Sequence, residues 1–114
     1  MITLYHNPRC SKSREALALL QAKGIEPELR LYLEQPLTAT ELKALLSKLG
    51  IKPRELLRKG EAAYKELNLN DETLKDAALI KAMVENPKLI ERPIGVKGKT
   101  AVVGRPPENL LALL

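Results

Sequence analysis

Apolar and polar residues alternate at the start of the chain, switch to a helical spacing, and then alternate again. Residues 2–6 alternate and predict a strand. Residues 11–23 carry apolar side chains at helical spacing, and Gly24 follows as a residue that favours the position just after a helix. Residues 28–33 alternate once more and predict a second strand. Two strands joined by a helix form a βαβ unit, with parallel pairing and a right-handed crossover.

The middle of the chain, residues 36–86, has an almost wholly helical pattern. Thr38 and Glu41 form a capping box, and leucines follow at i, i+3, i+4 and i+7 until Gly50 ends the helix. Three further helices are predicted in this segment, beginning at Pro53, Glu61 and Asp71.

The last part of the chain returns to short strands. Residues 89–96 and 99–103 predict a hairpin, and a final helix begins at about Pro107. The order βαβ, helices, ββ, α predicts an α/β fold of the thioredoxin-like type, with a four-stranded mixed sheet, flanking helices and a helical insertion between the βαβ and ββα halves. We expect one domain over residues 1–114, with the sheet core in 1–35 and 87–114 and the insertion in 36–86.

Composition narrows the class of protein further. Of the 114 residues, 45% are apolar and 29% are charged, which is typical of a soluble globular domain. No apolar run approaches the roughly 18 residues of a membrane helix, and no signal-peptide pattern is present. A single cysteine rules out a disulfide framework and favours a reducing, cytoplasmic setting. The net charge is +5, but the basic residues are scattered along the chain with acidic residues among them. We therefore expect a solvated basic surface rather than nucleic-acid binding or a membrane contact.

That single cysteine, Cys10, falls where the first predicted strand gives way to a helix. The unpaired N–H groups and the dipole of a helix N-terminus favour a negative charge there. Arg9, Lys12 and Arg14 add positive charge nearby. A free thiol has a pKa of about 8.5, so a depression of about two units makes the nucleophilic thiolate the major form near neutral pH. We therefore expect Cys10 to be reactive.

Two neighbours bear on what Cys10 can do. Ser13 lies one helical turn further on, on the same face, so its hydroxyl can donate a hydrogen bond to the thiolate. It cannot close a disulfide, and any redox cycle must borrow a thiol from elsewhere. Pro93 interrupts the third predicted strand, where thioredoxin-like proteins hold a cis-proline that faces the thiol. We predict that the Arg92–Pro93 bond is cis.

Several motifs give the chain a closer resemblance. In chain order they are His6-Asn7-Pro8-x-Cys10-x-x-Ser13-Arg14, Tyr32-Leu33-Glu34-x-Pro36, Leu56-Leu57-Arg58-Lys59, Asn86-Pro87, Arg92-Pro93-Ile94 and Gly104-Arg105-Pro106. Together they resemble the glutaredoxin-coupled arsenate reductase family, in a shorter branch, over essentially the full chain. Ser11 and Lys12 stand where the better-characterised members tend to have glycine and threonine.

The resemblance implies a function and a set of roles. Cys10 matches the nucleophile that forms a thiol–arsenate adduct. Arg58, Arg92 and Arg105 match the arginines that hold the oxyanion, and rigid guanidinium forks suit a tetrahedral anion.

The remaining implications concern the residues around the thiol and the reductants. His6 and Ser13 match residues thought to favour the thiolate, and Arg14 and Pro93 belong to the same motifs. Glutathione, as co-substrate, attacks the adduct and releases arsenite, and glutaredoxin resolves the mixed disulfide. No metal or bound cofactor is implied, and the role is arsenic detoxification in the cytoplasm.

Three alternatives differ in mechanism. Cysteine phosphatases and low-molecular-weight arsenate reductases need Cys-x5-Arg, and Ala16 stands where that arginine would be. A monothiol, glutathione-linked oxidoreductase without arsenate activity needs only Cys10. A regulator of the Spx type binds RNA polymerase and usually senses oxidation through Cys-x-x-Cys, a switch that Ser13 removes without excluding polymerase binding.

Overall fold

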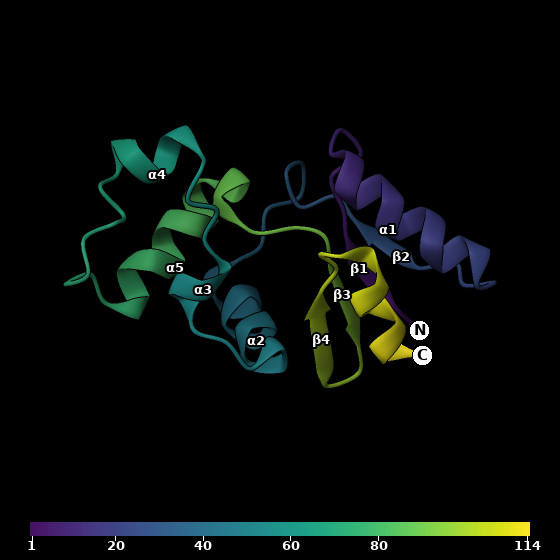
Figure 1. Cartoon of the computed structure of the whole chain (residues 1–114). Coiled ribbons are helices and arrows are strands. Elements are labelled where there is room, and N and C mark those ends of the chain that lie inside the picture. Colours follow the sequence, from purple (N-terminus) through teal and green to yellow (C-terminus); the bar gives the residue numbers. More distant parts are fainter. The chain divides into compact units, whose positions relative to one another are not determined.

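A computed structural model describes all 114 residues, and the chain divides into two compact units (Figure 1). The sheet unit comprises residues 1–35 and 92–114, and the helical unit comprises residues 36–91. The boundary therefore places residues 87–91 with the helices. That the whole chain acts as one domain stays a prediction.

The sheet unit contains a four-stranded mixed sheet. Its elements are β1 (Thr3–Tyr5), α1 (Ser11–Ala22), β2 (Glu28–Arg30), β3 (Ile94–Lys97), β4 (Thr100–Val103) and the 3-10 helix η2 (Pro107–Leu113). The strand order is β2-β1-β3-β4; β1 pairs with β2 in parallel and with β3 antiparallel, and β3 pairs with β4 antiparallel. The predicted α/β class and mixed four-stranded sheet are confirmed.

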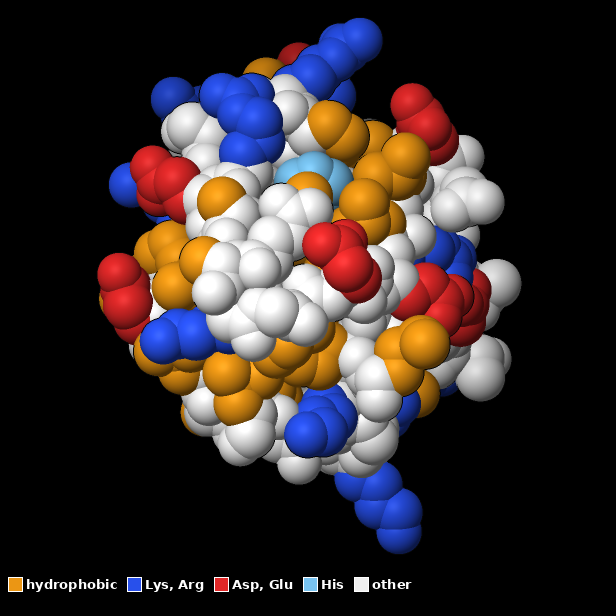
Figure 2. Space-filling model, turned by 90° about the vertical axis from the view of Figure 1, so that its right-hand side faces the viewer, with side chains coloured by type: hydrophobic (Ala, Val, Ile, Leu, Met, Phe, Trp, Pro, Cys, Tyr) orange, Lys and Arg blue, Asp and Glu red, His pale blue; other side chains and the backbone are white.

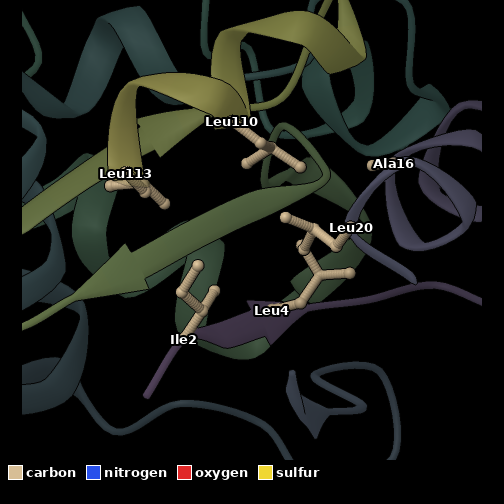
Figure 3. Close-up of a cluster of buried hydrophobic side chains, with 6 residues drawn as sticks. All are labelled: Ile2, Leu4, Ala16, Leu20, Leu110 and Leu113. Atoms are coloured by element: carbon tan, nitrogen blue, oxygen red, sulfur yellow. The ribbon is translucent and has the colours of Figure 1, made fainter. Parts of the chain in front are cut away.

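One face of this sheet is closed by helices. Leu4 of β1 and Ile2, just before that strand, pack with Ala16 and Leu20 of α1 and with leucines of η2, and all of these side chains are nearly inaccessible to solvent (Figure 3). Gly95 of β3 makes that approach possible: a Cβ atom there would lie 2.6 Å from the Cδ2 atom of Leu110. These contacts fasten α1, and with it the residue at its N-terminus, to the sheet.

The third strand begins later than predicted. Residues before Ile94 form a 3-10 helix, η1 (Pro87–Leu89), and an irregular segment. The N–H group of Glu91 donates to the carbonyl oxygen of Leu56, and Ile90 forms an isolated bridge with Leu57. The backbone of this segment is thus satisfied by the helical unit, which removes it from the sheet ladder.

The helical unit is built as the leucine pattern predicted. Its helices are α2 (Ala39–Leu49), α3 (Pro53–Leu56), α4 (Ala62–Glu66) and α5 (Asp76–Glu85), followed by η1. The capping box is confirmed, because the Glu41 N–H group donates to Thr38 Oγ1 over 3.1 Å and the Thr38 N–H group donates to Glu41 Oε1 over 3.0 Å. Helix α2 ends at Gly50, whose backbone is in the left-handed region, and its leucine face packs against α5.

Helix α5 starts several residues later than predicted. Asp71 Oδ1 accepts hydrogen bonds from the backbone N–H group and the hydroxyl of Thr73, and Lys75 is the residue that precedes the helix. The prediction that Asp71 caps this helix is therefore wrong. A short local turn around the aspartate competes successfully with helix initiation.

The surface carries charges of both signs. Acidic side chains lie among basic ones on the face drawn in Figure 2, with apolar areas between them. This is the arrangement expected of a solvated surface. None of the helices in either unit has the length and apolar character needed to cross a membrane.

Candidate active site

Cys10 occupies the N-cap position of α1. Its backbone is extended, with φ −94° and ψ 123°, and its carbonyl oxygen accepts the first helical hydrogen bond from the Arg14 N–H group over 3.0 Å. The Cys10 N–H group donates to the carbonyl oxygen of Asn7 over 3.0 Å, which closes the turn between β1 and α1. The thiol is free and half-buried. The predicted strand-to-helix position of the sulfur is confirmed.

Cys10 stands at the helix position where serine, threonine, aspartate or asparagine is the usual residue. Burial raises the pKa of the Cys10 thiol. Hydrogen bonding from the Ser13 N–H group, the Arg92 side chain and the Lys12 N–H group, together with the charge of Arg92, lowers it by more. The pKa therefore lies below its ordinary value. The lowered pKa agrees with the prediction. The positive charge that lowers this pKa is that of Arg92. The sequence analysis had relied instead on the neighbouring side chains of Arg9, Lys12 and Arg14.

Sheet register brings Arg92 and Arg105 to the same end of the sheet. Ile94, which opens β3, pairs with Val103 near the end of β4, and the Gly104 N–H group donates to the Pro93 carbonyl oxygen over 2.8 Å. Strand β1 ends beside Ile94, so the turn that carries Cys10 leaves the sheet at this end too. Two of the three predicted oxyanion ligands therefore lie at the end of the sheet that carries the nucleophile.

The predicted proline geometry is also present. The Arg92–Pro93 bond is cis, as expected, and Pro93 is buried against Gly104. A second cis bond, between Arg105 and Pro106, was not predicted.

Arg58, the third predicted oxyanion ligand, belongs to the helical unit. Its N–H group donates to the Leu89 carbonyl oxygen over 2.8 Å, and its guanidinium Nη1 lies 2.8 Å from Glu61 Oε1. Its role at the thiol stays a prediction that rests on the sequence motif.

His6 and Ser13 form a buried polar pair. His6 Nδ1 and Ser13 Oγ are hydrogen-bonded at 2.6 Å, and the Asn7 N–H group donates to the same hydroxyl oxygen over 3.0 Å. Burial and then the charge of Arg14 lower the pKa of His6, which favours the neutral imidazole near neutral pH. The expected role of His6 in favouring the Cys10 thiolate stays a prediction. Ser13 lowers the pKa of the thiol through its backbone N–H group. The sequence analysis had expected the Ser13 hydroxyl to donate a hydrogen bond to the sulfur.

Arg14 has a local structural contact. Its Nη1 donates to the Pro8 carbonyl oxygen over 3.0 Å, which ties the first turn of α1 to the preceding loop. The sequence analysis named Asn7 within a motif but gave it no role, although its carbonyl, amide N–H and side-chain oxygen all hold this loop. Its identity as an asparagine in a turn was the available signal.

Replacing Ser13 with alanine tests the distinction between its hydroxyl and its backbone. The change leaves His6 Nδ1 and the Asn7 N–H group without their partner, so we expect the free energy of unfolding to fall by about 1–3 kcal/mol. The backbone N–H group of residue 13 remains, so the Cys10 pKa should stay depressed. Denaturant unfolding and the alkylation rate of Cys10 against pH measure the two effects.

Ser11→Ala is the matched control, because Ser11 is exposed on the same helical turn. It should leave the free energy of unfolding nearly unchanged. A Ser13→Ala protein of normal stability whose thiol titrates like a free cysteine would reverse the assignment, and would return the hydroxyl to the sulfur.

No group of three or more His, Cys, Asp or Glu side chains is arranged to hold a metal ion. The polar groups gathered at Cys10 are hydrogen-bond donors and a guanidinium, which suit an anion. The site can therefore present a thiolate to an anionic electrophile and offset the charge of both.

Known proteins are similar to this chain over nearly its whole length. The model of the ArsC family matches residues 5–113. The chain is 56% identical to the uncharacterized protein YfgD of Escherichia coli (strain K12), over 99% of this chain and 96% of that protein. It is 48% identical to an arsenate reductase of Haemophilus influenzae, over 99% of this chain and 98% of that protein. The solved structure of an arsenate reductase from Vibrio cholerae is similar with a TM-score of 0.96 and 53% identity, over 99% of this chain and 97% of that chain.

Proposed function

Because this chain belongs to the ArsC family, we propose that it reduces arsenate to arsenite, with Cys10 as the nucleophile. One observation carries the proposal beyond family membership. Cys10 is the N-cap residue of α1, and the Ser13 and Lys12 N–H groups together with the side chain and charge of Arg92 lower the pKa of its thiol. An activated thiolate beside a guanidinium is what attack on an oxyanion requires.

The proposed first step is attack of the Cys10 thiolate on arsenic(V). A sulfur–arsenic bond forms, and one arsenate oxygen leaves as water after protonation. The thiolate and the anion repel one another, so the step depends on donors that offset their charge. Hydrogen bonds to charged groups contribute about 1.5–3 kcal/mol each. We assign this role to Arg92 and Arg105, and by the sequence motif to Arg58.

The second step requires an external thiol, because Cys10 is the only cysteine. We propose that glutathione attacks the Cys10 sulfur of the adduct. The sulfur–arsenic bond then breaks with its electron pair on arsenic, arsenite leaves, and Cys10 is left as a mixed disulfide with glutathione. Glutaredoxin attacks the glutathione sulfur and frees the Cys10 thiolate. Glutathione is thus a co-substrate and no cofactor is held; the cytoplasm is the proposed location, since its thiols are reduced.

A coupled assay tests the proposal. Purified protein is mixed with glutathione, glutaredoxin, glutathione reductase and NADPH, and NADPH oxidation is followed with and without arsenate. We expect oxidation to depend on arsenate, on glutaredoxin and on the protein together. If arsenate leaves the rate unchanged while a small disulfide raises it, the protein is a general thiol oxidoreductase and the proposal fails.

A further inference from the structure

The Arg58 guanidinium is fixed by one of its nitrogens. Nη1 lies 2.8 Å from Glu61 Oε1 and donates to the Lys88 carbonyl oxygen over 3.3 Å. The Arg58 and Glu61 side chains are 24% and 26% exposed, so the ion pair is half-buried. The backbone holds the same pair together, because the Glu61 N–H group donates to the Arg58 carbonyl oxygen over 3.3 Å.

These contacts use one end of the guanidinium and leave the other available. Nη1 has two N–H groups, and its two partners account for both. Nε and Nη2 make no hydrogen bond within the chain. Their N–H groups form the edge of the guanidinium that offers two parallel donors, which is the geometry that binds two oxygens of a tetrahedral anion.

We propose that Glu61 is a positioning residue for Arg58, which holds Nη1 so that the Nε–Nη2 edge is presented to the oxyanion. The proposal rests on the role assigned to Arg58 under the proposed function. An arginine side chain has many rotamers, and an anion that binds a free one must immobilise it. With Nη1 already held, that loss of freedom is incurred during folding and not during binding.

The negative charge of Glu61 acts in the opposite direction, because it offsets part of the positive charge that attracts the anion. Two substitutions separate these effects. Glu61→Ala removes both the tether and the charge. Glu61→Gln removes the charge and keeps an oxygen that can accept from Nη1. If Glu61 acts by positioning Arg58, the alanine variant should bind arsenate less well and the glutamine variant should bind it as the wild type does.

The first measurement needs no arsenate. Nuclear magnetic resonance of protein with isotope-labelled arginine reports rotation of the guanidinium, with the Arg58 signals identified by their loss in Arg58→Ala. We expect separate, slowly exchanging Nη signals for Arg58 in the wild type, in Glu61→Gln and in Glu66→Ala, and averaged signals in Glu61→Ala. Glu66 is the matched control, since it is exposed on α4 and has no ion pair.

The second measurement is a double-mutant cycle in the coupled assay. Ordering one side chain corresponds to about a threefold to tenfold change in affinity, so Glu61→Ala should raise the arsenate KM by that factor with a smaller change in kcat. In an Arg58→Ala background the same substitution should have no further effect on KM, because the two residues act as a unit.

Several results would overturn the inference. Averaged Arg58 signals already present in the wild type would show that Glu61 holds nothing. A lower KM in Glu61→Ala would show that the carboxylate competes with the anion. If Arg58→Ala leaves the arsenate KM unchanged although arsenate is reduced, the inference falls while the proposed function stands. If no arsenate is reduced at all, the proposed function falls, and the resonance result then describes only the ion pair.

Discussion

Cys10→Ser is expected to lower kcat for arsenate reduction by at least about a thousandfold, which is the scale seen when a nucleophile is removed. A serine hydroxyl is far less acidic than a thiol. It has no sulfur with which to form the sulfur–arsenic bond of the adduct or a disulfide with glutathione. No other cysteine exists to take over. The coupled assay measures the effect, and mass spectrometry of the protein after treatment with oxidised glutathione should show one adduct in the wild type and none in the variant.

Ser11→Ala is the control for this experiment too, because it alters the adjacent N-terminal turn of α1 without touching the sulfur. We expect it to retain close to full activity. Arsenate-dependent turnover by Cys10→Ser above the rate without protein would contradict the assignment of the nucleophile.

Arg92→Ala is expected to lower kcat/KM for arsenate by about a hundredfold to a thousandfold, the range found when one donor to a developing charge is removed. Two effects combine. The variant loses a ligand assigned to the oxyanion, and it loses the side-chain hydrogen bond and positive charge that lower the Cys10 pKa. Arg92→Lys keeps the charge but lacks the rigid fork, so it should restore the thiol pKa more fully than the activity.

The pH dependence separates the two effects. A thiolate is present above the pKa of its group and is lost as the pH falls through it. In the wild type the midpoint of the alkylation rate against pH should lie below that of a free thiol, because the Cys10 pKa is lowered. In Arg92→Ala the midpoint should move upward. Arg9→Ala should leave it in place, since Arg9 is exposed and is not among the groups that lower this pKa.

If the midpoint is the same in Arg92→Ala as in the wild type, the guanidinium does not activate the sulfur. A loss of kcat/KM without a shifted midpoint would then assign Arg92 to the oxyanion alone.

Short-range patterns were sufficient for much of this fold. Alternation and helical spacing located the βαβ unit, and the capping box of Thr38 and Glu41 was correct to the residue. The position of Cys10 at the start of α1 followed from the same reasoning. Features of this kind depend on residues a few positions apart, so the local sequence contains the information that determines them.

Other features needed contacts between distant segments. The third strand starts at Ile94 because Glu91 bonds to Leu56, and Arg92 reaches the Cys10 sulfur because β3 pairs with β1. The Ser13 hydroxyl is taken by His6 and the Asn7 amide, which no helical spacing could reveal. Hydrogen-bond partners and charge neighbours of this kind are chosen when the sheet and its covering helices assemble, so residue spacing along the chain does not contain them.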